Sequence, residues 1–541
     1  MKTKHLFSTV KQLFSMVGSF AILFLLTGCI FDSLKTPEDT TGNGDTIVVE
    51  VTVRMPHDTP QTRISFEQDG LNVDLAWEEG DNIDLLVVHG GDKTAHLQVP
   101  VTIDGGNNKK ATFTLSLPLG TYETFDLYGV YGGGGLDATD PHLIKLPTYE
   151  ESTSSCLKEL GKNKGMVLVF SETGINKNSP NLSLDFEHIG SLFNIQVKNI
   201  GGSTLDKVTE ARLIASTAIP AYSNSGAETY DVTTGTFSGS QTTSLTFRPV
   251  SSSNVVSEGI LEFWAWVPIE LGGGTEVLWP ELGLEIDSDG ASIPATTPKD
   301  GKNATVGKAY YLYATYDGAD LIFATESDMT VATGKVADFR DGNLYNTVTI
   351  GSQTWLKENL AYLPSVVGPG TGSYTYPYYY VHGYDGTDVA TAKETTNYQT
   401  YGVLYNWPAA MNGEASSDVN PSGVRGICPY GWHLPSDDEW EQLVTHLGGS
   451  DIAGDKLKEK GTTHWESPNE GTNSSGFTAL PGGYRYSNGT FYHIGYYGYW
   501  WSSAENYTDY AWNWTLYYDY GNVSRNYNYK SYGFSVRCVR D

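Results

Sequence analysis

The sequence lacks the features of several large protein classes. Its 4 cysteines in 541 residues are too few for a disulfide-stabilised scaffold. The apolar run from Val17 to Leu26 is roughly half of the ~20 residues that a helix needs to cross a bilayer. Basic residues are scarce, 34 against 63 acidic ones, and the net charge of −29 repels nucleic acid and anionic lipid. We therefore expect no nucleic-acid partner, although the same acidity also keeps an exported protein soluble.

Motifs for catalysis and metal binding are missing too. The sequence contains no Gly-x-Ser-x-Gly, no His-Glu-x-x-His and no Gly-Lys-Ser/Thr phosphate loop. The stretch Asp287-Ser288-Asp289-Gly290 begins like a calcium loop, but Pro298 stands where the closing Glu is needed. We expect no enzyme, no cofactor and no metal. The histidines of the C-terminal part have no metal-ligand spacing: His433, His446, His464 and His493.

The N-terminus has the layout of a secretory signal, with three lysines, an apolar run and small residues before a cysteine. The stretch Leu26-Thr27-Gly28-Cys29 resembles a bacterial lipobox, which implies that Cys29 is acylated and becomes the first mature residue. Residues 1–28 are then a signal peptide, and the polar residues 29–45 a flexible tether. We expect a lipid-anchored protein of the bacterial outer membrane or cell surface; the alternative is a soluble protein that is secreted and cleaved nearby.

Short strand-like runs separated by Gly, Asn, Asp and Ser turns dominate the chain up to residue 430. In the first run Val49, Val51 and Val53 fall on one face. Because long helical periodicity is almost absent here, we predict a mainly β protein with two tandem β-sandwiches, at residues 46–187 and 188–325. The predicted strands are 46–55, 83–88, 111–117, 166–170, 192–197, 261–267 and 309–316.

Two motifs in this part resemble fimbrillin-like proteins: Thr62-Arg63 followed by Trp77 and Gly80-Asp81, and His188 leading into an apolar strand. The resemblance implies fimbrillin (transthyretin-like) sandwiches of a type V pilus subunit. In that family the first strand is removed after an Arg, and a strand from another subunit takes its place. Arg54 and Arg63 both follow a strand-like segment and are candidate cut sites, or else ordinary surface arginines.

Residues 326–336 lose the strand pattern and are predicted to link the sandwiches to a third domain at 337–541. There Ser436 and Glu439 form a capping box ahead of a helix with an apolar stripe. Several motifs in order resemble the Fibrobacter succinogenes major paralogous domain, which implies an α+β fold related to C-type lectins. These motifs lie at 338–360, 401–413, 426–449, 476–485, 498–505 and 533–541.

The lectin-like resemblance implies a disulfide between Cys428 and Cys538, which ties the last strand to the helix region. Two reduced, buried thiols are the alternative, and Cys156 is left over. Phe534, Val536 and Cys538 alternate with other residues, so we predict that the chain ends in a strand with these three inside. Enzymes of the related formylglycine-generating family use two cysteines close together, which this domain lacks.

The stretch from Gly495 to Lys530 is dominated by Tyr, Trp and Asn. Trp500, Trp512 and Trp514 are expected in the core, whereas tyrosines that alternate with Asn and lack aliphatic neighbours are typical of surfaces. We predict either a recognition surface for a glycan or protein ligand or only a tyrosine-rich exterior. The candidate ligand-binding residues are Tyr507, Tyr517, Tyr527, Tyr529, Asn513, Asp519 and Arg525.

These observations favour a pilus tip subunit or surface adhesin that presents a lectin-like domain. Its expected partners are other pilus subunits through donor-strand addition, a glycan or a host or bacterial surface protein, and the membrane through the lipid. A tip position is favoured because about 200 residues follow the second sandwich, so its last strand is awkward to donate. The alternative is a lipid-anchored glycan-binding protein for nutrient capture that never enters a pilus.

Overall fold

The computed structural model describes residues 46–541 apart from positions 57–67, 70–71, 74–76, 78–79, 91–92, 106, 119–121, 156, 158–159, 161–164, 179–180 and 223–224. The expected signal peptide, the tether, Cys29, Arg63 and Cys156 lie outside the described residues. Among the residues described, no helix has the length and apolar character needed to cross a membrane.

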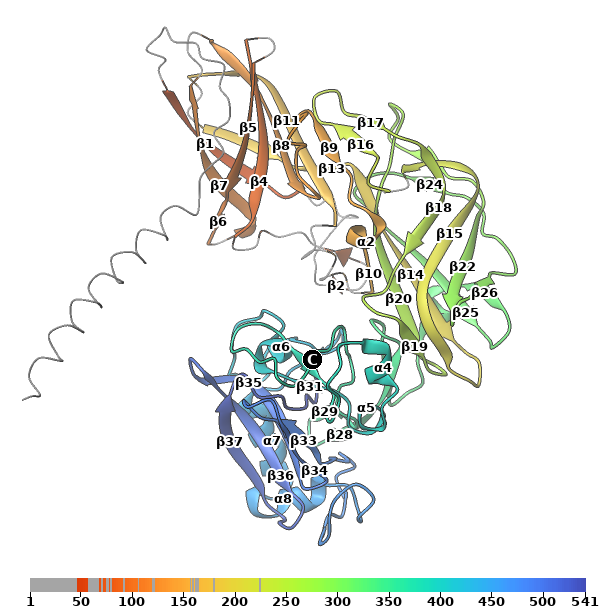
Figure 1. Ribbon diagram of the computed structural model, residues 1–541, viewed down its shortest axis with the longest axis vertical. Helices are drawn as coiled ribbons and strands as arrows, with labels where there is room; N and C mark the ends of the chain where they lie inside the picture. Colours follow the sequence, from red (N-terminus) through yellow and green to blue (C-terminus); the bar gives the residue numbers. More distant parts are fainter. Residues whose placement is uncertain are drawn as a thin grey trace, which may run out of the picture.

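The protein is mainly β, as expected, and every strand predicted before residue 320 is present. Figure 1 shows the first set of strands, in red to yellow, at one end of the molecule. They form two sheets. One has the order β12 (Asn181–Asp185), β1 (Thr46–Arg54), β7 (Asn107–Pro118) and β6 (Thr102–Asp104). The other has the order β13 (Glu187–His188), β11 (Val167–Asn176), β8 (Thr124–Gly132), β4 (Asn82–His89) and β5 (Lys93–Pro100).

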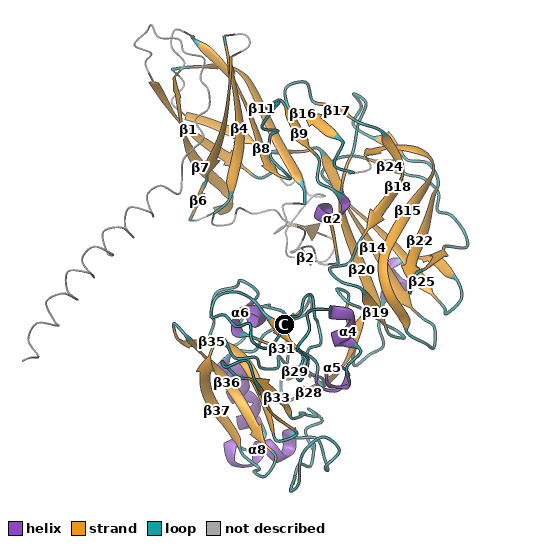
Figure 2. Ribbon diagram, viewed as in Figure 1, coloured by secondary structure: helices purple, strands orange, loops and turns teal. Residues whose placement is uncertain are grey.

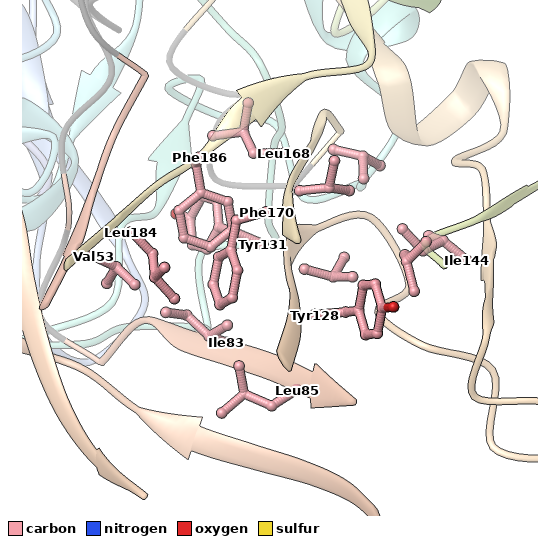
Figure 3. Close-up of a cluster of buried hydrophobic side chains, with 14 of the residues drawn as sticks. Val53, Ile83, Leu85, Tyr128, Tyr131, Ile144, Leu168, Phe170, Leu184 and Phe186 are labelled. Atoms are coloured by element: carbon pink, nitrogen blue, oxygen red, sulfur yellow. The ribbon is translucent and has the colours of Figure 1, made fainter. Parts of the chain in front are cut away.

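A hydrophobic core fills the space between these two sheets. Figure 3 shows Val53 of β1 and Ile83 of β4 pointing toward one another, with an aromatic group beside them. Phe170 and Phe186 contact edge to face, with ring centroids 5.0 Å apart. Because alternate side chains of each strand point inward, the period-2 apolar pattern of the sequence becomes a two-layer core.

Strand β1 is an interior strand of its sheet. It pairs antiparallel with β7 over its whole length and parallel with β12 from Glu50 to Arg54. Val49, Val51 and Val53 are buried, whereas Glu50 is exposed. The last residue, Arg54, is partly exposed and its Nη1 lies 3.2 Å from Asp185 Oδ1. Loss of β1 would therefore leave both neighbouring strands with unpaired backbone groups along an apolar groove.

The second set of strands, yellow to green in Figure 1, also forms two facing sheets. Trp264 and Trp266 of β20 belong to the first core, while Phe263 and Val267 belong to the second. Strands β14 and β20 are therefore buried on both faces. The sheet orders are β10 (Thr153–Ser154), β20 (Ile260–Pro268), β14 (Gly190–Asn199), β25 (Ala309–Tyr316) and β26 (Leu321–Ala324); and β18 (Gln241–Phe247), β15 (Leu205–Tyr222), β22 (Leu282–Ser288) and β23 (Ala291–Pro294).

Smaller elements decorate these sheets. A short helix, α2, spans Tyr149–Ser152, and a 3-10 turn, η1, spans Glu326–Met329. The remaining short strands are β2 (Gln68–Asp69), β3 (Asn72–Val73), β9 (Leu143–Lys145), β16 (Thr229–Asp231), β17 (Thr236–Ser238), β19 (Ser253–Val255), β21 (Val277–Leu278) and β24 (Asn303–Ala304).

The segment that follows β26 packs against the second set of strands. Ile260 of β20, Met329 and Ala337 form a small separate core. The Glu262 N–H of β20 donates to the Phe339 carbonyl at 2.7 Å. The expected linker and the residues directly after it are thus fixed to the sheet, by apolar contacts at Met329 and Ala337 and by the backbone bond at Phe339.

The C-terminal part, cyan to blue in Figure 1, holds most of the helices shown in purple in Figure 2. One sheet has the order β27 (Lys335–Asp338), β28 (Asn343–Ile350), β29 (Gln353–Leu356), β38 (Val539–Arg540) and β32 (Trp432–His433). The other has the order β34 (Phe491–Ile494), β33 (Gly482–Arg485), β35 (Tyr497–Tyr507), β36 (Tyr510–Tyr517) and β37 (Val523–Tyr529). The other elements are α4 (Val389–Lys393), α5 (Thr396–Tyr401), α6 (Trp407–Met411), α7 (Asp437–His446), α8 (Ser450–Leu457), β30 (Tyr379–Tyr380) and β31 (Leu404–Tyr405).

The predicted helix start at Ser436 is confirmed in α7. Ser436 Oγ accepts from the Glu439 N–H at 3.1 Å, and a Glu439 oxygen accepts from the Ser436 N–H at 2.9 Å. Trp440, Leu443 and Val444 are buried against the second sheet. Cys428 and Cys538 form the expected disulfide and are 110 positions apart in the sequence.

The prediction of a last strand with Phe534, Val536 and Cys538 inside is confirmed in part: all three side chains are buried, but the segment is not a regular strand. Only Val539–Arg540 form strand β38, and Arg537, expected to alternate outward, is fully buried. Its guanidinium donates to the carbonyls of Leu356 and Phe477 and to Asn359 Oδ1. The end of β29 and the loops that hold Asn359 and Phe477 supply these oxygens, so both sides of the segment are covered and the alternation carries no information about exposure.

An aromatic cluster beside a cleft

The structure separates the seven predicted binding residues into several places. Tyr507 and Tyr527 are exposed, by 65% and 50%. Tyr529 is half-buried and lies near them, whereas Tyr517, also half-buried, contacts Tyr497 and Tyr520 at the other end of β36. Asp519 is exposed in the turn after that end. The four tyrosines predicted from the sequence to bind a ligand are therefore divided between the two ends of β36.

Asn513 does not lie on the surface, contrary to its selection as a binding residue. Its side chain has an exposure of 0%. The Asn513 amide donates to Thr515 Oγ1 at 3.2 Å and accepts from Asn528 Nδ2 at 2.8 Å. The alternation along β36 predicts that Asn513 faces outward, but this face of the strand is covered, and the buried amides satisfy one another.

Arg525 is exposed, but its guanidinium already has partners. Its guanidinium lies 3.5 Å from the centroid of the Trp512 ring, and its Nε donates to Asp437 Oδ2. Asp437 Oδ1 accepts from Trp514 Nε1 at 2.9 Å. Burial raises the pKa of Asp437, and the contacts with Arg525 and Trp514 oppose that shift. Trp512, expected in the core, is half-buried beneath this arginine. Arg525 is thus fixed over the face of the Trp512 ring.

Six rings from neighbouring elements form what we call the aromatic cluster. Tyr510 stacks on Tyr529 with ring centroids 4.4 Å apart, and a hydrogen bond with Tyr529 raises the pKa of Tyr510 to about 12. The other ring pairs are edge to face at 5.5 to 6.4 Å, which is the usual range for aromatic side chains. As we define it, the cluster consists of Tyr374, Tyr507, Tyr510, Trp512, Tyr527 and Tyr529. The ring contacts continue beyond it, since Tyr529 also contacts Tyr532 with ring centroids 5.7 Å apart.

A cleft of about 390 Å³ adjoins the cluster at Tyr374. One wall comes from the loop with Tyr374, Thr375 and Pro377, and the other from α6 and the turn after it, residues 407–408 and 411–414. Tyr374 is 41% exposed and its ring centroid lies 5.8 Å from that of Tyr529. The volume is within the range of small-molecule sites, about 300–1,000 Å³.

Asn406 holds the two walls of the cleft together. It is fully buried, and its Oδ1 accepts from the N–H groups of Tyr378 (2.8 Å) and Ala409 (3.1 Å). Its Nδ2 donates to the carbonyls of Ser373 (3.0 Å) and Tyr376 (2.8 Å). One side chain thus caps α6 and fixes the loop that carries Tyr374.

Trp407 is anchored to β35, which pairs with β36. Its Nε1 donates to the Ser502 carbonyl of β35 at 2.9 Å, and Lys530 Nζ lies 4.5 Å from its ring centroid. Lys530 in turn pairs with Glu505 at 3.1 Å. These contacts place α6 beside β35, as the labels in Figure 1 show. The cleft, through Trp407, and the aromatic cluster, through Tyr507, are therefore both attached to β35.

His433, a histidine of the C-terminal part, is buried. Its Nε2 lies 2.7 Å from Glu439 Oε1, and its Nδ1 lies 2.7 Å from Asp541 Oδ1. Both nitrogens are occupied, so the imidazole is not available to a substrate. In the part of the chain that the structure describes, no group of three or more His, Cys, Asp or Glu side chains is placed to hold a metal ion.

Sequence reasoning missed Asn406, Trp407 and Tyr374. The order Asn406-Trp407-Pro408 is a usable signal for a helix start, since Asn is a favoured N-cap and Pro is favoured in the first turn. Nothing local shows that the same Asn binds a loop 28 to 33 residues earlier.

Comparison with known proteins supports the C-terminal resemblance. Residues 348–540 match the family model of the Fibrobacter succinogenes major domain. No protein with a curated description matches the chain. The family-model match begins within the first of the ordered motifs, covers the others up to residue 540, and does not extend to the sandwiches.

Solved structures resemble about half of the chain. A candidate cell adhesion protein from Bacteroides ovatus is 14% identical with a TM-score of 0.32, and the match covers 51% of this chain and 94% of that one. The tip fimbrial protein Mfa3 from Porphyromonas gingivalis is 10% identical with a TM-score of 0.25, covering 51% and 98%. The fimbrial anchor protein Mfa2 from the same organism is 8% identical with a TM-score of 0.27, covering 51% and 95%.

Proposed function

We propose that this protein is a cell-surface adhesin that presents its C-terminal part to a glycan or protein ligand. The observation that carries the proposal is the aromatic cluster beside a cleft, on supports fixed by Asn406 and Trp407. Tyr and Trp give large contact areas with few rotatable bonds and a polar tip, which suits recognition. We also propose that the C-terminal part has the lectin-like fold that the sequence motifs imply.

The exposed rings are oriented before any ligand arrives. Tyr527 contacts Tyr507, Tyr510 and Trp512, so its ring has neighbours on several sides although half of it is exposed. A ring that is already fixed loses little conformational freedom on binding. This distinguishes the cluster from scattered surface tyrosines, which would gain no such advantage.

We further propose that the protein is lipid-anchored through Cys29 at the outer surface and occupies a pilus tip. Removal of β1 after Arg54 would expose the edges of β7 and β12 and the apolar groove that Val49, Val51 and Val53 of β1 now fill, to which another subunit can add a strand. At the other end, the segment after β26 is fixed to β20 through Ile260, Met329 and the Glu262 bond. A strand fixed in this way is poorly suited to donation, which favours a subunit that accepts and does not donate.

The alternative of nutrient capture uses the same binding surface without assembly. The two are separated by treatment with an Arg-specific protease and electrophoresis of the products. Polymers that depend on cleavage near Arg54 support the pilus role. Binding without any polymerisation supports a lipid-anchored glycan-binding protein. In both cases we propose binding without catalysis, since neither the cluster nor the cleft contains a nucleophile paired with a base.

The test is a glycan and surface-protein array probed with the full-length protein in detergent. We expect binding that the double variant Tyr507→Ala/Tyr527→Ala reduces at least tenfold. The control is Tyr520→Ala, which removes a tyrosine of 62% exposure outside the cluster. Unchanged binding by the double variant, or equal loss in the control, would show that the cluster is not the recognition surface.

A further inference from the structure

A second group of tyrosines lies on the face of β36 opposite to Trp512. Tyr517 comes five positions after Trp512, and side chains an odd number of positions apart in a strand point to opposite faces. We call this group the tyrosine row, and it consists of Tyr484, Tyr492, Tyr497, Tyr499 and Tyr517. Ring contacts continue from the row to Tyr486, His493 and Tyr520, and through the buried Tyr532 to Tyr529 of the aromatic cluster.

The row crosses four neighbouring strands, in the order β34, β33, β35 and β36. Tyr492 of β34 contacts Tyr484 of β33 with ring centroids 5.8 Å apart, and Tyr484 contacts Tyr499 of β35 at 5.0 Å. Tyr497 of β35 contacts Tyr517 of β36 at 5.1 Å. Three steps between strands of ~4.8 Å each give the row a length of about 14 Å. This is longer than one sugar ring and matches a chain of several sugars.

The core holds these rings in place. Tyr499 stacks on the buried Phe534 with ring centroids 4.9 Å apart, and Tyr484 contacts the same ring edge to face at 6.0 Å. The side chain of Tyr492 is exposed, and those of the other row tyrosines are partly exposed. A ring that is already fixed loses little conformational freedom when a ligand binds. The row therefore presents fixed aromatic surface to solvent.

Most hydroxyls of the row are available to a ligand. Tyr492 Oη accepts from Asn488 Nδ2 at 3.1 Å. The other four hydroxyls have no hydrogen bond to any residue that the structure describes, and their oxygens are accessible to solvent. Burial raises the pKa of Tyr499, and the nearby hydroxyls of other row tyrosines raise it further. Because each phenol hydroxyl can both donate and accept, this gathering matches the hydroxyls of a sugar chain.

The row contains no charged side chain. Lys458, whose Nζ donates to the carbonyls of Tyr517 and Tyr520, is fully buried and paired with Asp455 at 3.2 Å. Burial lowers the pKa of His493, which contacts Tyr497, so its imidazole is neutral at neutral pH. A charged group of a ligand would lose its hydration here without an ionic partner in the row. An uncharged ligand suits the row better.

We propose that the tyrosine row is a second binding site, which takes a linear, uncharged oligosaccharide. The apolar faces of the sugar rings pack against the tyrosine rings, and the sugar hydroxyls bond to the free tyrosine hydroxyls. The proposal does not depend on recognition by the aromatic cluster, because the row is built on other side chains. One molecule of the protein can then hold two ligands at once.

The test uses uncharged sugar chains of two lengths. The full-length protein, in a detergent without a sugar headgroup, is titrated with cello-, manno- and xylo-oligosaccharides of two and of six sugars. We expect at least one six-sugar chain to bind at least tenfold more tightly than its two-sugar counterpart, because only the longer chain covers the row. Hexamers of galacturonic acid and of glucosamine are the charged comparisons, and both should bind at least tenfold more weakly than that chain.

Two variants assign the binding to the row. Tyr492→Ala removes its exposed end, and Tyr497→Phe/Tyr517→Phe removes two hydroxyls but keeps the rings and therefore the packing. Each should weaken binding of the six-sugar chain at least fivefold, with circular dichroism unchanged. The control is Tyr376→Ala, because Tyr376 is 68% exposed and makes no ring contact with any described residue. This control should bind like the wild type.

The cluster variant Tyr507→Ala/Tyr527→Ala separates this proposal from the proposed function. Binding of the six-sugar chain that survives in this variant and falls in the two row variants supports a second site. Binding that falls only in the cluster variant would assign the chain to the cluster and overturn the second site, while the proposed function would stand. Failure of every uncharged hexamer to bind, or tighter binding of a charged hexamer, would also overturn the second site.

Discussion

Asn406→Ala tests whether one buried side chain maintains the cleft. The wild-type amide makes four hydrogen bonds to backbone groups, two as acceptor and two as donor, and all four are lost in the variant. A net contribution of about 0.5–1.5 kcal/mol per bond gives an expected loss of about 2–6 kcal/mol in the free energy of unfolding. The partners are backbone groups near the surface loop, so water can replace some bonds and the lower half of the range is expected.

Guanidinium denaturation followed by tryptophan fluorescence suits this measurement. Nine of the 13 tryptophans lie in residues 337–541, so the signal reports mainly on the C-terminal part. Hydrogen exchange adds local resolution: the amides of Tyr378 and Ala409 should lose protection while those of β36 keep it. Glycan binding should fall in parallel, since the Tyr374 wall is no longer fixed.

Asn488→Ala is the control for this prediction. Asn488 is exposed in the turn between β33 and β34, and its side chain bonds to Tyr492 Oη and the Thr490 N–H. Its loss should change the free energy of unfolding by less than about 1 kcal/mol. If Asn406→Ala costs no more than this control and leaves the exchange of Tyr378 unchanged, the loop is held by other contacts and the reasoning fails.

Three further predictions concern the rest of the molecule. Replacing Cys428 and Cys538 by Ser should lower the free energy of unfolding by up to about 4–5 kcal/mol, because the bond closes a loop of 110 residues; an unchanged denaturation midpoint would contradict this. Arg54→Gln should prevent cleavage by an Arg-specific protease at the end of β1, which N-terminal mass spectrometry of the products detects; the same cut in the variant would exclude Arg54. Burial disfavours the charged form of His433, but the bonds of its ring to Glu439 and Asp541 outweigh burial and raise the pKa of His433. Charged His433 therefore stabilises the fold. This stabilisation is complete below the unfolded pKa of about 6.5 and is lost as pH rises through the folded pKa. His433→Gln should therefore cost more stability at pH near 5.5 than at pH near 8.5, and denaturation curves with equal losses at both would refute the ion pairs.

Local patterns in the sequence determined much of the fold. Alternating valines predicted β1, and the Ser436 capping box with its apolar stripe predicted α7, because both depend on neighbours within one turn or strand. The ordered C-terminal motifs also identified the segment that the family model matches. Alternation gave the wrong exposure for Asn513 and Arg537, because both lie in segments that are covered on both sides. The burial of a side chain depends on what packs against the segment and not on the segment's own pattern.

The sequence by itself determined that this is a mainly β chain with an aromatic-rich end, because strand pattern and composition are properties of short stretches. Only the tertiary structure decided which aromatic residues belong together. Tyr374 comes 155 residues before Tyr529 and yet contacts it, and Asn406 joins α6 to a loop that no local signal links to it. A binding surface depends on such long-range contacts, which form when the two sheets and the helices of the C-terminal part pack against one another.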